Sequence, residues 1–376
     1  MHSIAKRGTL LYNNGDRGGT ESLGAVAANT YRQAGVDIDA GARTVGLARA
    51  AVRGTFGPNV LADLGHFGGL YALDPASEEG PVLVASADGV GTKLKLAFVL
   101  GTHRLVGHDI VNHCINDILA CGARPLFFLD YIASGKLVPE QTAEVVTGMA
   151  EACRAAGCAL LGGETAEMPG MYAAGEYDVA GFIVGMVARD RMLLGYDIEA
   201  GDVVLALPSN GLHTNGYSLA REVLGLNGDP ERARERLARY DETLGATLGE
   251  ALTRPHTSYL NDVAPLLDRA ERPVKGMAHI TGGGLLDNIP RVLPEGCAVE
   301  LDTVAWAVPP IFRLIQEVGG IERREMARVF NMGIGLVMIV SPEHVELVES
   351  MLPGSFRAGR VVASAAGERV SLRDEG

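Results

Sequence analysis

The sharpest chemical signal in this sequence is a short glycine-rich segment that carries one carboxylate and one lysine. It reads Asp88-Gly89-Val90-Gly91-Thr92-Lys93 and follows the apolar run 81–86. The glycines would let the backbone approach a phosphate closely, while Thr92 offers a hydroxyl and Lys93 a mobile positive charge. A carboxylate at the end of a strand, such as Asp88, can bind Mg²⁺. The spacing is not that of a Walker A loop, and taken alone such a segment is more often an ordinary turn than a phosphate site.

Four polar side chains recur on one face of an expected helix at 106–121. The apolar residues of this segment keep a 3.6-residue period, and Asp109, His113, Asn116 and Asp117 fall on the opposite side. An ordinary solvated face is the alternative, but this face lacks the Lys, Arg and Glu that usually coat one. We therefore favour a face that meets a metal ion or a nucleotide, with Asp117 as the preferred metal ligand.

Two further carboxylates, Glu164 and Glu167, lie in the segment 162–170, which we expect to form a tight loop after a short strand. Carboxylates in such loops usually serve solubility or capping. Beside a phosphate site they would complete a magnesium shell or orient a donor.

The second half of the chain offers two polar loops that each join a strand to a helix. Residues 210–216 supply amides, a hydroxyl and the imidazole of His213. A structural role for His213 and a role in proton transfer or substrate contact are both open. Gly282, Gly283 and Gly284 precede an expected helix at 285–293, and the free N–H groups at a helix start suit a phosphate.

Alternating strands and helices must position these residues. We expect strands at 81–86, 125–132, 159–161, 177–188, 203–207, 297–302, 334–340 and 357–363, and helices from 94, at 106–121 and 139–156, after 216, and at 285–293, 309–318 and 342–351. This alternation predicts an α/β to α+β fold in each half. A break at 190–201 divides the chain into domains at 30–195 and 196–376, after a loosely ordered extension at 1–29. Residues 226–250 form a charged, helical excursion that matches no motif.

Composition limits the classes of function. The chain has 376 residues, enough for two cores, and its formal net charge of -13 would repel a nucleic-acid backbone, so we expect no nucleic-acid partner. No apolar run approaches the ~20 residues that span a bilayer and no secretory signal is evident, so we expect no membrane partner. The five cysteines are an odd number without a C-x-x-C pair, which is typical of the reducing cytoplasm.

Longer motifs give the chain a family resemblance. They lie at 31–41, 88–93, 111–122, 125–131, 162–171, 213–218, 279–284, 288–293 and 330–333. In this order they resemble the AIR synthetases, the phosphoribosylformylglycinamidine cyclo-ligases, from about residue 30 to residue 365. The segments 1–29 and 226–250 depart from that pattern. So does His66, which stands where the family often has a glycine.

The resemblance implies a reaction and a set of site residues. Such enzymes convert formylglycinamidine ribonucleotide and ATP to aminoimidazole ribonucleotide, ADP and phosphate, through a phosphorylated formyl oxygen. It implies Mg²⁺ on Asp88 and Asp117, and catalysis by Lys93, Asp117 and His213, with His213 as the base of ring closure. It also assigns residues 88–93, Asn116 and Glu164 to the ATP site and residues 282–284 to the substrate phosphate.

The resemblance further implies a cytoplasmic homodimer, with an N-terminal α/β domain whose sheets combine across the dimer and an α+β C-terminal domain. One alternative is another enzyme of the same ATP-using superfamily: thiamine-monophosphate kinase, selenide-water dikinase or the amidotransferase of the preceding step. A second alternative is a nucleotide-binding maturation or scaffold factor without ring-closing activity. The joint presence of Asp88, Asp117 and His213 favours the cyclo-ligase.

Overall fold

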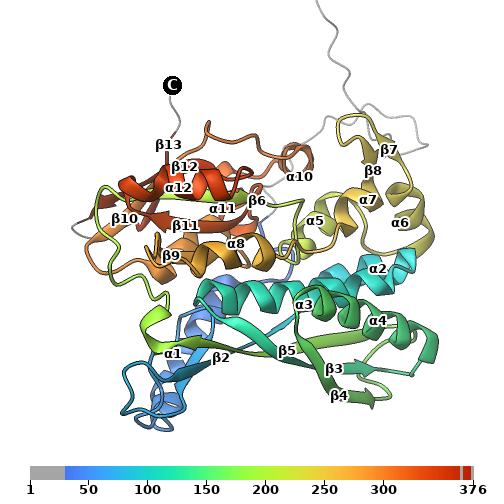
Figure 1. Ribbon diagram of the computed structural model, residues 1–376. Helices are drawn as coiled ribbons and strands as arrows, with labels where there is room; N and C mark the ends of the chain where they lie inside the picture. Colours follow the sequence, from blue (N-terminus) through green and yellow to red (C-terminus); the bar gives the residue numbers. More distant parts are fainter. Residues whose placement is uncertain (1–29, 365–366, 374–376) are drawn as a thin grey trace, which may run out of the picture.

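The computed structural model describes residues 30–364 and 367–373, so the expected extension at 1–29 lies outside the described residues. Within these ranges the chain forms two halves, each built on a mixed or mostly antiparallel sheet with helices packed on it. The long helix α3 (His103–Ala120) lies between the N-terminal sheet and the C-terminal half (Figure 1). None of the helices within these ranges is both long enough and apolar enough to cross a membrane.

The N-terminal sheet has the strand order β1-β2-β5-β3-β4, in which β3 and β4 pair in parallel and the other neighbours pair antiparallel. Buried and exposed residues alternate along β5, as expected for a sheet with one covered face. The helices α3 and α4 cover that face (Figure 1). The elements of this half are α1 (Ile38–Arg53), β1 (Gly69–Ala72), β2 (Pro81–Gly89), η1 (Gly91–Lys93), α2 (Leu94–Leu100), β3 (Arg124–Ser134), α4 (Pro139–Ala155), β4 (Ala159–Glu167), β5 (Tyr177–Ala188) and η2 (Arg189–Arg191).

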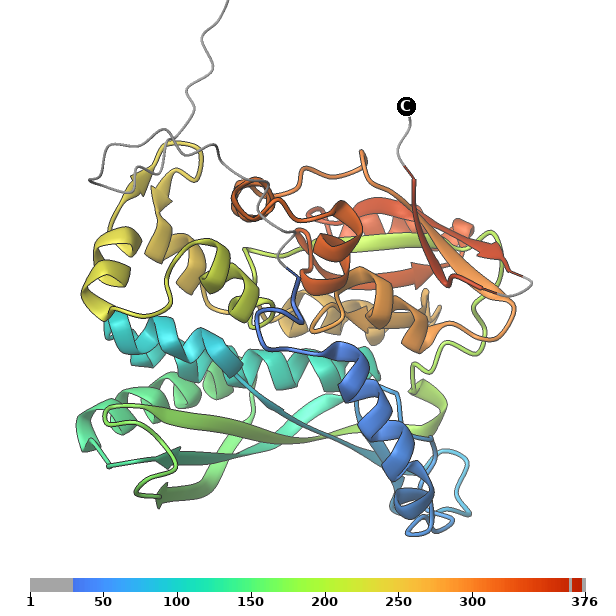
Figure 2. The same ribbon diagram turned by 180° about the vertical axis from the view of Figure 1, so that it is seen from behind.

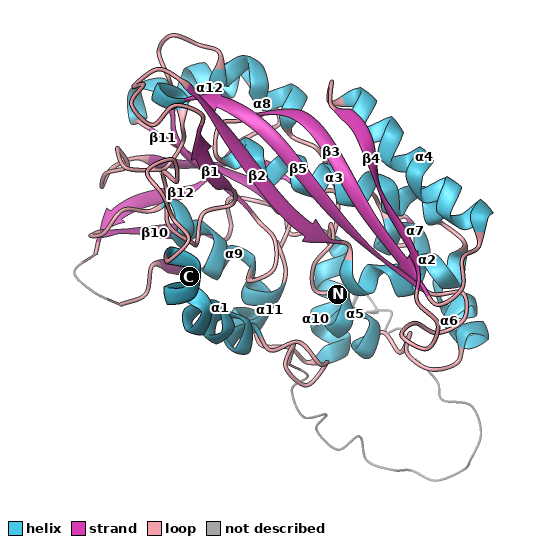
Figure 3. Ribbon diagram, turned by 90° about the horizontal axis from the view of Figure 1, so that it is seen from below, coloured by secondary structure: helices cyan, strands magenta, loops and turns pink. Residues whose placement is uncertain are grey.

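The other face of this sheet has no covering helix among the described residues, as the view from below shows (Figure 3). Large apolar side chains are exposed on its neighbouring strands: Tyr71, Leu126, Leu129, Leu161, Phe182 and Met186. In the strand register Leu129 of β3 lies opposite Phe182 of β5. Proteins that work as monomers rarely expose so many apolar side chains together, so this face is suited to a partner surface.

The C-terminal sheet has the strand order β13-β10-β12-β6-β11-β9. Every residue of β11 is buried, because elements pack on both faces of the sheet there. The elements around this sheet are β6 (Val203–Pro208), α5 (Tyr217–Val223), α8 (Leu260–Leu267), β9 (Val274–His279), α9 (Gly284–Asn288), η3 (Ile289–Val292), β10 (Cys297–Asp302), α10 (Pro310–Gly319), α11 (Arg323–Val329), β11 (Ile334–Val340), η4 (Pro342–His344), α12 (Val345–Met351), β12 (Phe356–Ala363) and β13 (Val370–Arg373).

The excursion expected at 226–250 is only partly helical. It contains α6 (Pro230–Leu237), a short hairpin of β7 (Tyr240–Asp241) and β8 (Ala246–Thr247), and the start of α7 (Leu248–Thr253). A capping box between Thr247 and Glu250 begins α7. Both helices pack on α2 of the N-terminal half, so the excursion is part of the contact between the halves (Figure 2).

The predicted strands and helices are present, with changes of a few residues at their ends, but one expectation is wrong. Residues 162–167 are not a loop; they continue β4. Gly163 allows this close pairing with β3 because it has no side chain: a Cβ on it would sit only 2.3 Å from Asp130 O. The helices α1, α8 and α11 and the strands β1 and β13 were not predicted. The connection 189–202 between β5 and β6 contains the expected domain boundary.

Candidate active site

The polar face of α3 is buried against the second half of the chain. Asn116 donates from Nδ2 to Thr257 O at 2.7 Å and accepts from Tyr259 N at 3.0 Å. One turn earlier, Asn112 donates to His256 O at 2.8 Å. These amides hold the backbone of the segment that follows α7, so this face is neither solvated nor open to a ligand at these positions. The side-chain oxygen and nitrogen of Asn116, expected in the ATP site, are both used in this contact.

Lys93 is an internal cation and not the mobile charge that was expected. Its side chain is 3% exposed, and Nζ donates to Asp109 Oδ1 and to Arg254 O, each at 2.8 Å. Burial opposes both charges: it lowers the pKa of Lys93 and raises the pKa of Asp109. Asp109 Oδ1 also accepts from His256 N at 2.7 Å. The pair therefore ties the glycine-rich segment to α3 and to the second half.

Four buried histidines gather where α3 meets the second half. His113 comes from α3, His213 from the loop after β6, His256 from the segment before α8, and His279 from the end of β9. Neighbouring rings have centroids 4.0–5.1 Å apart, and none of the four residues is more than 2% exposed. Since His113 comes from the N-terminal half and the other three from the C-terminal half, all four come together only when the two halves pack.

The hydrogen bonds of this cluster admit one consistent set of protons when His256 and His279 are neutral. Asp117 accepts from His279 Nδ1 at 2.8 Å, so Nε2 of a neutral His279 accepts from His256 Nε2 at 2.9 Å. Nδ1 of His256 then accepts from the hydroxyl of Thr214 at 3.3 Å, which accepts from His113 Nδ1 at 2.7 Å. Burial lowers the pKa of both His256 and His279, in keeping with neutral rings.

Asp88 and Asp117 flank the fourth histidine. His113 Nε2 forms an ion pair with Asp88 Oδ2 at 2.7 Å and lies 3.9 Å from Asp117 Oδ2, which accepts from Ser86 Oγ at 3.0 Å. Burial acts to lower the pKa of His113, but the carboxylates outweigh it and raise this pKa to about 9. Burial likewise acts to raise the pKa of Asp88, yet the charge of His113 holds it below its usual value. Asp88 is the more accessible carboxylate, with 42% of its side chain exposed against 8% for Asp117.

His213 combines backbone strain with an unsatisfied side chain. Its φ of 60° is left-handed, which costs a non-glycine residue roughly 1–2 kcal/mol. Neither ring nitrogen has a hydrogen-bond partner among the described residues, and the ring stacks on His256. Gly335 makes room for it, because a Cβ there would lie 2.8 Å from His213 Cε1. Burial lowers the pKa of His213 well below its usual value, so the neutral form prevails near pH 7. Such features are typical of a functional position.

The triple-glycine loop borders the His213 loop. A Cβ on Gly282 would approach Asn215 Oδ1 to 3.2 Å, and both Gly283 and Gly284 have left-handed φ values, of 96° and 57°. Asn288 fixes the loop by donating to the carbonyls of Thr281, Gly282 and Gly284 at 2.8–3.3 Å. The two loops thus meet at Gly282 and Asn215, while Gly283, Gly284 and His213 are buried.

Glu164 is not brought to this cluster within one copy of the chain. It lies exposed on the edge strand β4, which β5 and β3 separate from β2 and Asp88. Its register partner is Tyr131 of β3. The other carboxylate of this segment, Glu167, accepts from Leu137 N at 3.0 Å.

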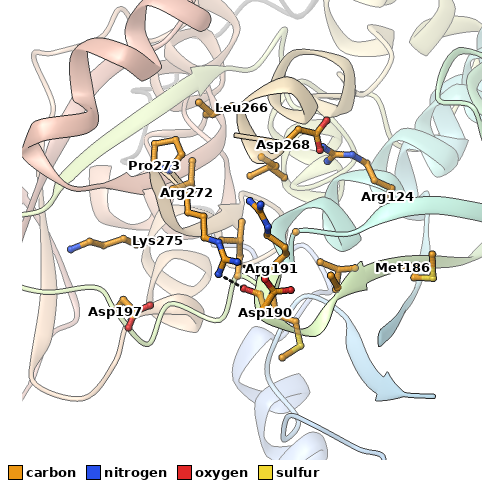
Figure 4. A pocket seen from close by; sticks show the side chains of 17 residues that line it. Arg124, Met186, Asp190, Arg191, Asp197, Leu266, Asp268, Arg272, Pro273 and Lys275 are labelled. Carbon is orange, nitrogen blue, oxygen red and sulfur yellow. Dashed lines mark hydrogen bonds and ion pairs between the residues drawn. The ribbon is translucent and has the colours of Figure 1, made fainter. Parts of the chain in front are cut away.

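Two surface pockets differ in their relation to the cluster. One, of about 390 Å³, opens between η2 and β9 and is lined by Arg124, Arg272 and Lys275 among others (Figure 4). Three of its cations are in ion pairs, Arg124 with Asp268, Arg272 with Asp190 and Lys275 with Asp202, and it contains no predicted site residue. A second pocket, of about 480 Å³, is lined mainly by 62–71 and by 85–87, directly before Asp88.

Sequence reasoning singled out His213 but gave no role to His256 and His279. His279 had a signal, since it ends a strand immediately before the triple glycine. His256 stands alone between Pro255 and Thr257 with no pattern around it, and only the packing of the two halves shows its neighbours.

Comparison with known proteins gives consistent matches along the chain. Residues 69–187 match the model "AIR synthase related protein, N-terminal domain", and residues 199–370 match the corresponding C-terminal domain. The phosphoribosylformylglycinamidine cyclo-ligase of Desulfitobacterium hafniense (strain DSM 10664 / DCB-2) is 53% identical over 339 residues, which cover 90% of this chain and 97% of that protein. The enzyme of the same name from Geobacillus thermodenitrificans (strain NG80-2) is 50% identical over 89% of this chain and 96% of its own.

Solved structures share the fold at low identity. Thiamine monophosphate kinase from Aquifex aeolicus superposes with a TM-score of 0.58 at 16% identity, over 89% of this chain and 96% of that one. Hydrogenase maturation protein HypE in complex with ATP gives a TM-score of 0.57 at 19% identity, over 91% and 92%.

Proposed function

Because this chain belongs to the AIR synthase family, and within it to the phosphoribosylformylglycinamidine cyclo-ligases, we propose that the cluster on α3 is the centre of its ATP-dependent ring closure. The enzyme converts formylglycinamidine ribonucleotide to aminoimidazole ribonucleotide in purine biosynthesis, with release of ADP and phosphate. One observation carries this choice of site: Asp88 and Asp117 converge on His113 at the start of a hydrogen-bonded histidine cluster.

In this proposal ATP binds in the pocket of about 480 Å³ beside Asp88, with its phosphates toward residues 88–93. The volume lies in the usual range for small-ligand pockets. The pocket is lined by Ser86, whose hydroxyl donates to Asp117. Arg291 donates to the carbonyls of Gly65 and His66 and so orders one wall of the pocket. Glu164 would take part only if a second copy of the chain brought it near.

The carboxylates fit Mg²⁺, a hard cation that prefers oxygen ligands. Asp88 is half-exposed, and both carboxylates face the same atom, His113 Nε2, at 2.7 Å and 3.9 Å, so a cation beside them would meet two negative charges. Asp88 and Asp117 would hold the ion, which supplies charge neutralisation during phosphoryl transfer. Lys93 does not contact the ligand in this proposal. Its buried ion pair with Asp109 fixes the position of the glycine-rich segment.

The organic step needs a leaving group and a base. An amide oxygen leaves poorly, so its phosphorylation prepares the carbon for attack by an amidine nitrogen. His213 is neutral and has no protein partner among the described residues, which suits it to accept the proton of that nitrogen. Residues 282–284, which border the His213 loop, would bind the substrate phosphate.

The enzyme is proposed to act as a homodimer in the cytoplasm. The open apolar face of the N-terminal sheet supports the dimer. The five unpaired, buried cysteines are in keeping with a reducing compartment.

The decisive experiment incubates the purified chain with formylglycinamidine ribonucleotide and Mg-ATP. Aminoimidazole ribonucleotide and ADP should form in equal amounts and should depend on both substrates. ATP hydrolysis without imidazole product would contradict the activity, and full activity in an Asp88→Ala, Asp117→Ala double variant would contradict the site.

A further inference from the structure

We propose that His213, His256 and His279 form a binding site for a transition-metal dication of the zinc class, distinct from the oxygen-ligand position at Asp88 and Asp117. The three residues each offer one ring nitrogen, and these nitrogens all lie within 4.8 Å of one another. Three imidazole nitrogens select zinc, cobalt, nickel or copper, and not magnesium.

The outer contacts of two of these rings match a metal site. His279 holds its Nδ1 proton against Asp117 Oδ1 at 2.8 Å, which leaves Nε2 as a lone pair aimed at His256. Histidine ligands of zinc are commonly oriented by such a carboxylate. Nδ1 of His256 faces the hydroxyl of Thr214 at 3.3 Å. Moving the His256 proton from Nε2 to Nδ1 would let this hydroxyl accept it and would free Nε2 for the metal.

The third ring supplies the independent observation. His213 is 1% exposed, its two nitrogens have no partner among the described residues, and its ring stacks on His256 with centroids 4.0 Å apart. A buried imidazole without a hydrogen bond is destabilising, so a ligand is expected to satisfy it. Ligand nitrogens in a tetrahedral zinc site lie about 3.3 Å apart, and these nitrogens already lie within 4.8 Å of one another, so metal binding would draw them together while the stacked rings of His213 and His256 turn apart.

The alternative trio of His113, Asp117 and His279 is less suited to this ion. It would use Nδ1 of His279, which is already hydrogen-bonded to Asp117, and His113 Nε2, which is paired with Asp88.

Cobalt and zinc titrations of the full chain, without nucleotide or substrate, test the site. We expect one equivalent of Co²⁺ to give the intense visible absorption of tetrahedral nitrogen coordination. His256→Asn should weaken zinc binding roughly 100-fold or more, whereas His108→Gln, outside the cluster, should leave it unchanged. Because zinc would occupy the lone pair of His213, stoichiometric zinc should also inhibit ring closure, and a chelator should restore it.

Equal zinc affinity in His256→Asn and wild type would overturn the proposal. If that variant does not fold, X-ray absorption of the zinc-loaded wild type decides: three imidazole ligands support the site, and a shell of oxygen ligands overturns it. The absorption, affinity and X-ray readouts need no turnover, unlike the inhibition assay, so their failure would leave the cyclo-ligase assignment intact, and a failed cyclo-ligase assay would leave them valid.

Discussion

At the scale of single residues, Asp117 contacts both the histidine cluster and the proposed ATP pocket. Its Oδ1 orients His279 and its Oδ2 accepts from Ser86, while it also adds to the charge that keeps His113 protonated. Replacing this carboxylate with its amide would change the shape of the side chain little but would remove its charge. Its charge can therefore be tested separately from its packing.

We predict that Asp117→Asn lowers turnover by roughly 10²-fold or more, because one ligand charge no longer offsets the phosphates. The concentration of Mg²⁺ needed for half-maximal activity should rise. Steady-state assays at several Mg²⁺ concentrations measure both effects, with the exposed Asp262→Asn as the matched control. Near-normal turnover with unchanged magnesium dependence would remove Asp117 from the metal site.

For His213, asparagine is the informative replacement, because it tolerates the left-handed backbone that alanine would strain. We predict that His213→Asn folds, binds ATP and loses kcat by roughly 10²–10⁴-fold. Since its pKa lies well below the usual value, protonation of His213 should not lower kcat until the pH is well under about 6.5. If KM rises while kcat at saturation stays unchanged, His213 only binds the substrate.

At the scale of elements, α3 shows what periodicity can and cannot reveal. The period of its apolar residues predicted the helix. The lack of Lys, Arg and Glu on its polar face indicated that this face is not simply solvated. The pattern could not distinguish a face that binds a ligand from a face that packs on the other half of the protein. Asn116 was therefore expected in the ATP site, although its side chain hydrogen-bonds to the backbone of Thr257 and Tyr259. The loop predicted at 162–170 was wrong over 162–167 for a similar reason, because Gly163 permits close strand pairing as well as a turn.

Asn116→Ala should destabilise the fold by about 2–4 kcal/mol, because the buried Tyr259 N and the partly buried Thr257 O would both lose their Asn116 partner. Urea unfolding measures the change. Asn112→Ala is the comparison on the same helix face: it loses one hydrogen bond at a half-buried position and should cost about 1 kcal/mol. Equal effects of the two changes would contradict the clamp described for Asn116.

The contact of α3 with α4 depends on two facing glycines. A Cβ on Gly107 would lie 2.2 Å from Val145 O, and one on Gly148 would lie 2.0 Å from Arg104 O. Gly107→Ala should therefore separate the helices and destabilise the fold by about 1–3 kcal/mol or more. Gly46→Ala, within α1 and with open space around it, should instead stabilise the fold by about 0.5–1 kcal/mol. Thermal unfolding of both variants distinguishes packing from helix propensity.

At the scale of the whole molecule, the sequence predicted two α/β to α+β halves because strands and helices alternate throughout. It could not predict how the halves meet, since His113, His213, His256 and His279 come from four distant segments. The fold alone would not separate this enzyme from kinases and maturation proteins, which superpose at 14–19% identity. The identity of about 50% over most of the chain makes that distinction.

The remaining whole-molecule feature is the open face of the N-terminal sheet, which we predict to be the homodimer interface. Leu129 and Phe182 lie opposite each other on adjacent strands of this face. Phe182→Glu should yield a folded monomer at micromolar concentration, whereas the wild type should sediment as a dimer. Two-fold symmetry places the new charge in the interface twice, and a buried unpaired charge costs about 3 kcal/mol or more, roughly 10²-fold in affinity for each copy. Tyr240→Glu, at another exposed aromatic residue, on the β7–β8 hairpin, should leave the dimer intact. A wild-type monomer, or dissociation by both changes alike, would show that this face has another occupant.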